Sequence, residues 1–503
     1  MTDLFALGLR NRRAIPFASV PVQSADHFGA TMAEACARGH RLVSLFGLPD
    51  GADRARLVAL VADDAGGALG ITSTVVTQRY AAVTPSWPAA ERFEREIREQ
   101  CAVEPDGHPA LKPVRRHPPD HAPEAWTWEA PDREAYAFDR VDGDEVHEVG
   151  VGPVHAGIIE PGHFRFQAHG ERVLRLEIVL GYQHRGIERL LETADRMRAV
   201  LVAESIAGDT VIGHADAYCG ALEALARCRK TPRAQTIRGI ALELERLANH
   251  VGDLGALAGD IAYQPGAAWF GRLRGEFLNL LMAVSGNRYG RGLLRPGGVQ
   301  FDLTPPLVEE LRDRLHRLAE LLAPVARAMF ADASVQARLE GVGVVDPALA
   351  EREGFVGPVA RACEIPRDVR HDHPWGVFRF AHVPVATAWA GDVFARAQVR
   401  RLEIHRSLEF LHEQLASVPK GAPQVPTGDL RPDELVVALV EGWRGEIVHV
   451  VITDPRGGIR RHKVMDPSFH NWPALAAAMA GNEISDFPLC NKSFNLSYAG
   501  HDL

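Results

Sequence analysis

Hydrophobic positions at helical spacing dominate the middle of the chain. In the clearest stretch, apolar residues recur every three or four positions from Ile237 to Leu254. Thr231 and Pro232 stand before this stretch and are typical of an N-cap and a first helical position. The same periodicity predicts further helices at 192–229, 267–286, 305–331 and 391–417.

Near the end of the chain the pattern changes to a period of two. Residues 435–440 and 447–452 are mainly apolar over the length of a strand, and residues 459–464 form a third, more polar segment of that length. Asp454-Pro455-Arg456-Gly457-Gly458 supplies a turn before the third of these segments. We therefore predict antiparallel strands beside the helices.

The first hundred residues have a different composition from the middle. Residues 54–62 and 70–77 are apolar and rich in β-branched side chains, and residues 89–101 predict a charged helix. This mixture predicts a small domain that contains both strands and helices.

The stretch 104–150 contains seven prolines between Pro105 and Pro131, a density that breaks regular structure and is typical of a linker. His108, His117 and His121 lie in it. We interpret them as solvated histidines, because neither a cysteine nor a second tight pair accompanies them as a metal site would require.

At 503 residues the chain is long enough for two or more domains. We predict an α+β protein in three parts. Residues 1–103 form a small N-terminal α/β domain, residues 104–150 a Pro-rich linker, and residues 151–503 a mainly helical body with peripheral antiparallel strands.

Charge and cysteine content narrow the classes of function. A formal charge of -9 argues against a nucleic-acid protein, and no apolar run reaches the 18 or so residues needed to span a bilayer. The first residues lack the order of a signal peptide. We expect a cytoplasmic protein that reaches a membrane only through partners. Its six cysteines form no C-x-x-C pair and are expected to be reduced: Cys36, Cys101, Cys219, Cys228, Cys363 and Cys490.

Several segments of the body resemble the large subunit of nickel-iron hydrogenases, in the branch that also contains the quinone-side (D-type) subunit of respiratory complex I. Gly152-Pro153-Val154-His155, Glu160-Pro161-Gly162-His163-Phe164-Arg165 and His184-Arg185-Gly186-Ile187-Glu188 resemble the opening of the formate hydrogenlyase large subunit. The ending Asp466-Pro467-Ser468, Asn471-Trp472-Pro473 and Asp486-Phe487-Pro488-Leu489 also fits.

The first domain is similar to a second family. The segment from Pro85 to Glu96, followed by Gly107-His108-Pro109, resembles the small C-type subunit of complex I. Formate hydrogenlyase-type complexes commonly fuse the two subunits, and this chain has that layout. The resemblance therefore implies a C-type-like domain followed by a hydrogenase-like, D-type body.

The resemblance also shows what is missing. The family's four metal-binding cysteines fall on Ala207, Thr210, Ser497 and Gly500. Alanine and glycine offer no ligand atom, and neutral hydroxyls are poor substitutes for thiolates that bridge nickel and iron. We expect no metal, no active hydrogenase, and no remaining C-terminal extension of the kind the family cleaves.

The resemblance assigns roles to several other residues. His163 and Tyr218 fall where complex I contacts a quinone headgroup, and Asp260 matches an acidic position that couples quinone chemistry to the membrane arm. Glu160 resembles the carboxylate that passes protons at the hydrogenase site. His214 and Tyr218 share a predicted helical face with Ala207 and Thr210, and could hold the headgroup. Equally, both could simply fill a collapsed site with satisfied hydrogen bonds.

The function implied is that of a large subunit in a membrane-associated, hydrogenase-related respiratory complex that couples redox or quinone chemistry to ion translocation. Two alternatives stay open: a genuine fused subunit of NADH-quinone oxidoreductase, and a non-catalytic scaffold. Expected partners are a small iron-sulfur subunit, a ferredoxin-like subunit and membrane-anchor, ion-translocating subunits. Iron-sulfur clusters are expected in those partners, with no cofactor bound by this chain and quinone as a candidate substrate, at the inner side of the cell membrane.

Overall fold

Two four-stranded sheets lie at the centre of the molecule, and most of their residues are buried. The computed structural model describes residues 3–126, 136–155 and 159–503. The N-terminal sheet has the order β2-β5-β4-β3 and the body sheet the order β1-β13-β14-β15. Their strands are β1 (Ile15–Pro16), β2 (Val22–Gln23), β3 (Arg41–Pro49), β4 (Ala55–Asp63), β5 (Ala68–Val76), β13 (Glu434–Gly442), β14 (Gly445–Thr453) and β15 (Ile459–Met465).

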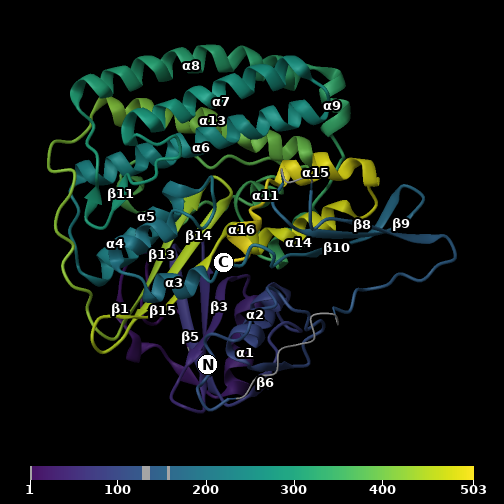
Figure 1. Cartoon of the computed structure of the whole chain (residues 1–503), viewed down its shortest axis with the longest axis vertical. Helices are drawn as coiled ribbons and strands as arrows, with labels where there is room; N and C mark the ends of the chain where they lie inside the picture. The colour runs from purple at the N-terminus through teal and green to yellow at the C-terminus, as the bar shows by residue number, and fades with distance from the viewer. Residues whose placement is uncertain (1–2, 127–135, 156–158) are drawn as a thin grey trace.

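Long helices form a layer over the body sheet, on the side away from the N-terminal sheet (Figure 1). Helix α6 packs against α7 and α13, and α7 packs against α8. Helix α5 lies across β13 and β14. These helices are α5 (Val211–Leu225), α6 (Pro232–Asp260), α7 (Gln264–Ser285), α8 (Pro305–Ala331) and α13 (Val393–Ala416).

Shorter elements complete the chain. Strands β8, β9 and β10 form an antiparallel sheet that projects from one side of the molecule (Figure 1). The remaining elements are α1 (Ala25–Ala37), β6 (Arg79–Ala81), α2 (Glu91–Cys101), β7 (Glu104–Asp106), β8 (Val146–Val151), β9 (His163–His169), β10 (Arg172–Val179), α3 (Ile187–Thr193), α4 (Arg196–Ala203), β11 (Leu294–Arg295), β12 (Gly298–Val299), α9 (Ala333–Leu339), α10 (Pro347–Arg352), α11 (Gly357–Arg361), α12 (Val369–Asp372), α14 (Pro467–Met479), α15 (Phe487–Phe494) and α16 (Tyr498–His501).

The predicted α+β class is confirmed, and so are most individual elements. The segment predicted as strand 447–452 lies within β14, and the predicted helix 305–331 coincides with α8. Thr231 caps α6 as expected, because its side chain accepts a hydrogen bond from the backbone N–H of Ala234. The three-part division of the chain stays a prediction.

The predicted helix over 192–229 is wrong. Two helices, α4 and α5, occupy this range, and residues 204–210 between them are not helical. Ala207 therefore does not lie on the helix that carries His214 and Tyr218. Tertiary hydrogen bonds to Asp209, described below, hold the turn open and override its helical pattern.

The interpretation of His121 as a solvated histidine is also wrong. Its side chain is 3% exposed, and its two ring nitrogens contact Asp120 at 2.6 Å and Glu192 at 3.0 Å. The carboxylate of Glu192 comes from α3 in the body. Part of the Pro-rich segment is thus packed against the body rather than surrounded by water.

The segment that precedes the N-terminal sheet contacts the body sheet directly. Strand β1 pairs with β13, the backbone N–H of Arg12 donates to Val437, and Asn11 exchanges hydrogen bonds with Leu439. Arg12 also forms an ion pair of 2.7 Å with Asp216 on α5. Residues 11–16 thereby cover the outer edge of β13, an edge that would otherwise present unpaired backbone groups.

Candidate functional site

The turn before α5 is fixed by side chains from two other elements. The carbonyl oxygen of Asp209 accepts hydrogen bonds from Asn249 on α6 and from Trp443, both at 3.0 Å. The first N–H groups of α5, at Ile212 and Gly213, donate to the Glu245 carboxyl group at 2.7 and 3.2 Å. Glu245 thus takes the place of an N-cap side chain and sets where α5 begins.

Arg444, in the tight turn between β13 and β14, joins this turn to the C-terminal tail. Its guanidinium donates to both carboxylate oxygens of Asp209, at 2.5 and 2.8 Å, and to the Thr210 hydroxyl at 3.1 Å. Its Nε donates to the carbonyl of Asn495 at 2.5 Å. Burial disfavours the charge on Arg444, but Asp209 outweighs burial and raises the pKa of the guanidinium.

The tail closes the other side of the same region. The Tyr498 backbone N–H donates to the Glu160 carboxylate at 3.2 Å, and the Ser497 N–H donates to the Ser468 hydroxyl at 2.8 Å. A Cβ atom at Gly500 would lie 2.5 Å from Cγ of Asp466, so the tail approaches that carboxylate closely. Burial raises the pKa of Glu160.

We call the set formed by Glu160, Asp209, Thr210, Arg444 and the tail residues 497–500 the Arg444 cluster. Two segments almost three hundred positions apart in the sequence, 207–210 and 497–500, meet here. The contacts of Arg444 and Glu160 hold the two segments together, and their role as one functional site stays a prediction.

The donor atoms in the Arg444 cluster do not fit a nickel-iron group. The Thr210 hydroxyl is engaged by Arg444, and the Ser497 hydroxyl accepts from the Gly500 N–H at 2.9 Å. A buried guanidinium would also repel a bound cation. Within residues 3–126, 136–155 and 159–503, no group of three His, Cys, Asp or Glu side chains is arranged to hold a metal ion.

None of the six cysteines forms a disulfide, and all six lie in described parts of the chain. Two of them are near these segments in sequence. Cys219 lies close to Arg238 and Glu223, and the sulfur of Cys490 lies close to Gly343. These surroundings differ from those of Thr210 and Ser497, so neither thiol stands in for a missing ligand there.

His214 and Tyr218 lie one turn apart on α5 but contact different groups. His214 is fully buried, and its Nε2 lies 3.0 Å from the Asp466 carboxylate beside the tail. The Tyr218 hydroxyl donates to the Arg196 carbonyl on α4 at 3.4 Å, and its ring stacks on His462 at 5.7 Å. Burial raises the pKa of Tyr218. Its assignment to a quinone headgroup stays a prediction.

The structure does not bring His163 and Asp260 into the Arg444 cluster by any hydrogen bond among the described residues. His163 begins β9, contacts the Gly152 carbonyl through Nδ1 at 3.2 Å and packs against Phe138. Asp260 ends α6 and forms an ion pair with Lys492 on α15. Of the predicted site residues, Glu160 bonds directly to the tail, and His214 contacts Asp466 beside the tail. The assignments of His163 and Asp260 stay predictions.

Sequence reasoning missed Arg444, Asp209 and Asp466, as well as two buried histidines, His449 and His462. A usable signal existed for His449, because it interrupts a segment that is otherwise apolar. His462 stands between Arg461 and Lys463 and offers no such contrast. Arg444 stands between two predicted strands, where a charged residue reads as a solvated turn. Only the tertiary structure shows that this turn points into the protein, with Arg444 6% exposed.

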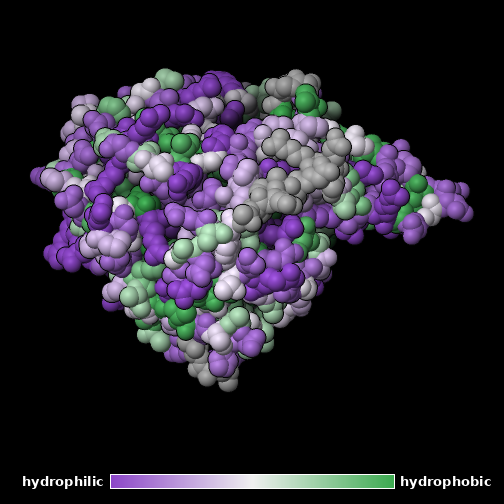
Figure 2. All heavy atoms as spheres, turned by 60° about the horizontal axis from the view of Figure 1, so that its bottom comes forward, coloured by the Kyte–Doolittle hydropathy of each residue, from purple (hydrophilic) through white to green (hydrophobic). Residues whose placement is uncertain are grey.

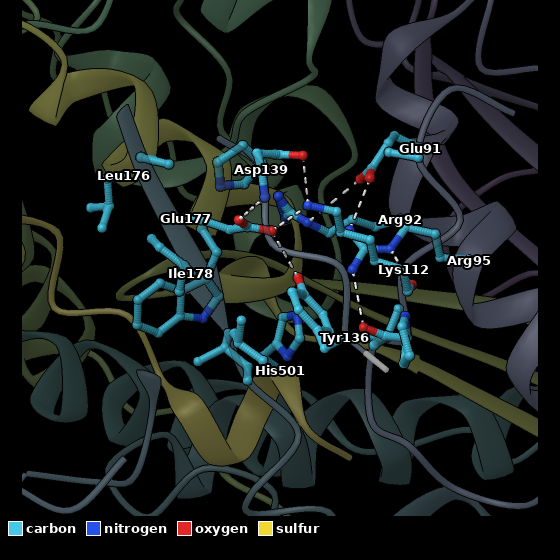
Figure 3. Close-up of a pocket in the computed structure, with 18 of the residues that line it drawn as sticks. Glu91, Arg92, Arg95, Lys112, Tyr136, Asp139, Leu176, Glu177, Ile178 and His501 are labelled. Carbon is cyan, nitrogen blue, oxygen red and sulfur yellow. Dashed lines mark hydrogen bonds and ion pairs between the residues drawn. The ribbon is translucent and has the colours of Figure 1, made fainter. Parts of the chain in front are cut away.

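A cleft of about 280 Å³ lies where α2, β10 and α14 meet the Pro-rich segment (Figure 3). Its charges are paired with one another. Lys112 contacts Asp139 at 2.9 Å and also pairs with Glu177, and Tyr136 donates to Glu177 at 3.2 Å. Arg95 pairs with Glu91 at 2.8 Å on the facing helix. The contacts of Lys112 and Tyr136 with Glu177 on β10 fasten the Pro-rich segment to the body.

The face shown in Figure 2 is mainly hydrophilic, with separate hydrophobic areas. Elsewhere in the sequence, α3 and α4 carry three exposed apolar side chains: Leu190, Met197 and Leu201. In the part of the chain that the structure describes, no helix combines the length and apolar character needed to cross a bilayer.

Comparison with known proteins places these features in a family. The family model described as the 49 kDa subunit of the respiratory-chain NADH dehydrogenase matches residues 260–432, and that of the 30 kDa subunit matches residues 52–139. Formate hydrogenlyase subunit 5 of Escherichia coli is 29% identical over 440 residues, which cover 84% of this chain and 77% of that protein.

Two further relatives are at least 30% identical to this chain and cover more than two thirds of it. Hydrogenase-4 component G of Escherichia coli is 30% identical over 85% of this chain and 76% of its own length. The carbon monoxide-induced hydrogenase of Rhodospirillum rubrum is 31% identical over 69% of this chain and 97% of its own length. The chain therefore belongs to the family that joins the large subunits of these hydrogenases to the 49 kDa subunit of respiratory complex I, and it carries a 30 kDa-type domain in the same polypeptide.

Proposed function

We propose that this protein is the large subunit of a membrane-associated, complex I-like respiratory complex and works there without a nickel-iron centre. In this proposal it is an oxidoreductase subunit that couples redox or quinone chemistry to ion translocation. The observation that carries the proposal is the Arg444 cluster. Where the family resemblance implies four thiolates, the chain has Ala207, Thr210, Ser497 and Gly500. A buried guanidinium bonds there to Asp209 and Thr210 on one side and to Asn495, two residues before Ser497, on the other.

The chemistry of the cluster supports an oxygen-rich substrate rather than a metal. Arg444 supplies a fixed positive charge that would stabilise negative charge on a quinone oxygen during reduction. Glu160 has a pKa raised by burial, so it is suited to hold a proton and release it. His163, Tyr218 and Asp260 remain the predicted headgroup and coupling residues, and Tyr218→Phe and His163→Ala test them directly.

The partners follow from what this chain lacks. Hydrogen bonds and ion pairs to a quinone supply no electrons, so we place the iron-sulfur clusters in a small iron-sulfur subunit and a ferredoxin-like subunit. Membrane-anchor and ion-translocating subunits would hold the complex at the inner side of the membrane. The exposed apolar side chains of α3 and α4 are the surface we assign to such a partner.

Metal analysis and a quinone-reduction assay on the intact purified complex test the proposal together. We expect less than stoichiometric nickel, and electron transfer to a quinone that falls at least ~10²-fold in Glu160→Gln, since a positioned acid or base contributes on that order. Glu171→Gln, an exposed carboxylate beyond β9, is the matched control and should keep full turnover. Stoichiometric nickel in the large subunit would overturn the proposal.

A second function is favoured by the two family models, because both describe subunits of the NADH dehydrogenase. In this alternative the chain is a fused subunit of a genuine NADH-quinone oxidoreductase. Purified complex that oxidises NADH with quinone as acceptor would select it. A complex that transfers electrons to no quinone and to no hydrogen acceptor would instead indicate a scaffold without catalysis.

A further inference from the structure

Three histidines and an aspartate form an unbroken hydrogen-bonded row through the core. Nε2 of His214 lies 3.0 Å from Oδ2 of Asp466, and Nδ1 of His214 lies 3.3 Å from Nε2 of His449. Nδ1 of His449 lies 2.9 Å from Nε2 of His462. All four side chains are fully buried and come from α5, β14, β15 and the N-cap of α14. We call this row the histidine chain.

The Asp466 end fixes the position of every proton in the row. Burial disfavours the Asp466 anion, but the hydrogen bond from His214 outweighs burial and lowers its pKa, so Asp466 only accepts. His214 therefore donates from Nε2 and, when neutral, accepts at Nδ1. It follows that His449 donates from Nε2 and accepts at Nδ1, and that His462 donates from Nε2.

The far end of the row is open. With its proton on Nε2, His462 presents a bare Nδ1, and that atom is buried and has no hydrogen-bond partner among the residues that the structure describes. Burial lowers the pKa of His462 to about 4 and that of His449 well below its usual value, so both rings are neutral at pH 7. The row therefore begins at an acceptor, Nδ1 of His462, and ends at the Asp466 carboxylate. All of its hydrogen bonds point from His462 toward Asp466.

We propose that the histidine chain is a proton wire that feeds the Arg444 cluster, an inference that rests on the proposed function as a proton-consuming quinone site. A proton that arrives on Nδ1 of His462 displaces the Nε2 proton to Nδ1 of His449, which does the same to His214. Each ring gains one N–H bond and loses one, and no electron moves. Asp466 receives the final proton, and each ring ends as its Nδ1–H tautomer.

The delivery end lies at the proposed site. Asp466 is in contact with Gly500 of the tail, and the charge of Arg444 acts on it. Reduction of a quinone takes up two protons with two electrons, and the electrons would come from the iron-sulfur clusters of a partner. Asp466 is therefore placed to pass on a proton where one is consumed.

The supply end lies beside a group of side chains that reaches the surface, but within the described residues none of them bonds to Nδ1 of His462. The backbone N–H of His462 donates to the Glu192 carboxylate at 3.0 Å, and Glu192 contacts His121, which contacts Asp120. Burial and Arg461 disfavour charge on His121, but its two carboxylate partners outweigh them and raise its pKa. The Asp120 side chain is 19% exposed, so this trio reaches solvent. Other charged groups that act on the row are Glu188, Arg461 and Arg12.

A substitution at His449 can distinguish a role in proton transfer from a role in packing alone. In the intact complex, His449→Gln should lower quinone turnover on the order of 10²-fold with KM unchanged, because the amide keeps hydrogen bonds but cannot take up a proton. His470→Gln, another buried histidine that lies outside the row, is the control and should keep turnover. In His449→Ala, added imidazole should restore turnover, whereas pyrrole, which lacks an acceptor nitrogen, should not. Full turnover in His449→Gln, or equal rescue by pyrrole, would overturn the wire.

A measurement without turnover keeps the wire testable if the complex reduces no quinone. Nitrogen NMR of the full chain should show His449 and His462 as neutral Nε2–H tautomers at pH 7. The Nε2 proton of His214 should exchange with deuterated water at least ~10-fold more slowly in His462→Gln than in the His470→Gln control, the scale of losing one relay step. Unchanged exchange, or a different tautomer at His449, would refute the wire, whereas absent quinone reduction alone would refute only the proposed function.

Discussion

The two central sheets have the same number of strands and the same degree of burial, yet they carry different chemistry. The N-terminal sheet is filled mainly by Val, Leu and Ala. Its buried polar side chains are the hydroxyls of Ser44, Thr72, Ser73 and Thr74 and the guanidinium groups of Arg41 and Arg56, and Arg41 pairs with Glu446 of the body sheet. The body sheet buries Glu446, His449, Arg461, His462 and Lys463, most of them tied to partners on other elements.

Buried charge is an expensive way to stabilise a fold, since a well-packed apolar side chain does as well or better. The N-terminal sheet shows that this chain can build such an apolar core. The charges and histidines of the body sheet are therefore best explained by their position between α5, the tail and the N-terminal domain. We therefore regard the N-terminal sheet as a structural scaffold and the body sheet as the one that carries functional side chains.

Lys463→Met gives the largest expected effect, because it removes one partner from a fully buried ion pair. Lys463 contacts Glu96 on α2 at 2.6 Å and Glu188 on α3 at 2.9 Å. Glu96 keeps Arg115 and Glu188 keeps Arg461, but these two buried carboxylates lose the ammonium that they share. This loss should lower the free energy of unfolding by ~3–5 kcal/mol. Chemical denaturation measures it, with the exposed Lys420→Met as control. A loss below ~1 kcal/mol would show that the body sheet does not depend on its charges.

Leu57→Ala makes the matched change in the N-terminal sheet. Leu57 is fully buried on β4, and loss of its side chain should cost ~2–5 kcal/mol of unfolding free energy. Because the N-terminal sheet acts as scaffold in our account, the turnover of complex that still assembles should be unchanged. If turnover fell as far in Leu57→Ala as in His449→Gln, the two sheets could not be distinguished by function.

Acid should destabilise the body through its neutral histidines. The pKa of His462 is lowered by burial to about 4, below that of an unfolded histidine at about 6.5. The unfolded chain therefore binds a proton that the folded chain refuses, so stability is complete above pH 6.5 and falls as the pH drops toward 4. The loss is on the order of 3 kcal/mol. His462→Gln should flatten this slope in unfolding measurements from pH 7 to 4, and an unaltered slope would contradict the assignment.

Thr72→Val gives the smallest expected effect and has the opposite sign. The Thr72 hydroxyl is buried on β5 and has no hydrogen-bond partner in the described part of the chain, so its removal should be neutral or stabilising by about 1 kcal/mol. The melting temperature of the purified chain measures this. A clear destabilisation would show that the hydroxyl is satisfied after all, and that the N-terminal sheet is less apolar in character than we describe.

Periodicity predicted the elements whose stability is local or strongly patterned. Helix α8 and strand β14 could be read from the sequence because a capped, amphipathic helix and an apolar strand carry their own signals. The break between α4 and α5 could not, because it depends on Asn249, Trp443 and Arg444, which are distant in sequence. Tertiary hydrogen bonds outweighed the local helical pattern.

The candidate site divides in the same way. Glu160 and His214 were predicted from the family resemblance, and they lie beside the tail. The neighbouring residues Arg444 and Asp466 were missed. A single arginine between two strands is usually a solvated turn residue, and a single aspartate before a helix is usually an N-cap. Their roles come from burial, which no spacing in the sequence displays.

The docking of residues 11–16 on β13 constrains the order in which the molecule can be built. Their binding edge is made of residues 434–442, more than four hundred positions later, so this arm has to wait until the rest of the polypeptide has been synthesised. If the chain were cut between its two family domains, residues 11–16 could dissociate from β13. The larger fragment would then expose an unpaired strand edge that is prone to aggregation. Fusion thus guarantees one copy of each domain, and separating the domains would expose the edge of β13 that residues 11–16 cover.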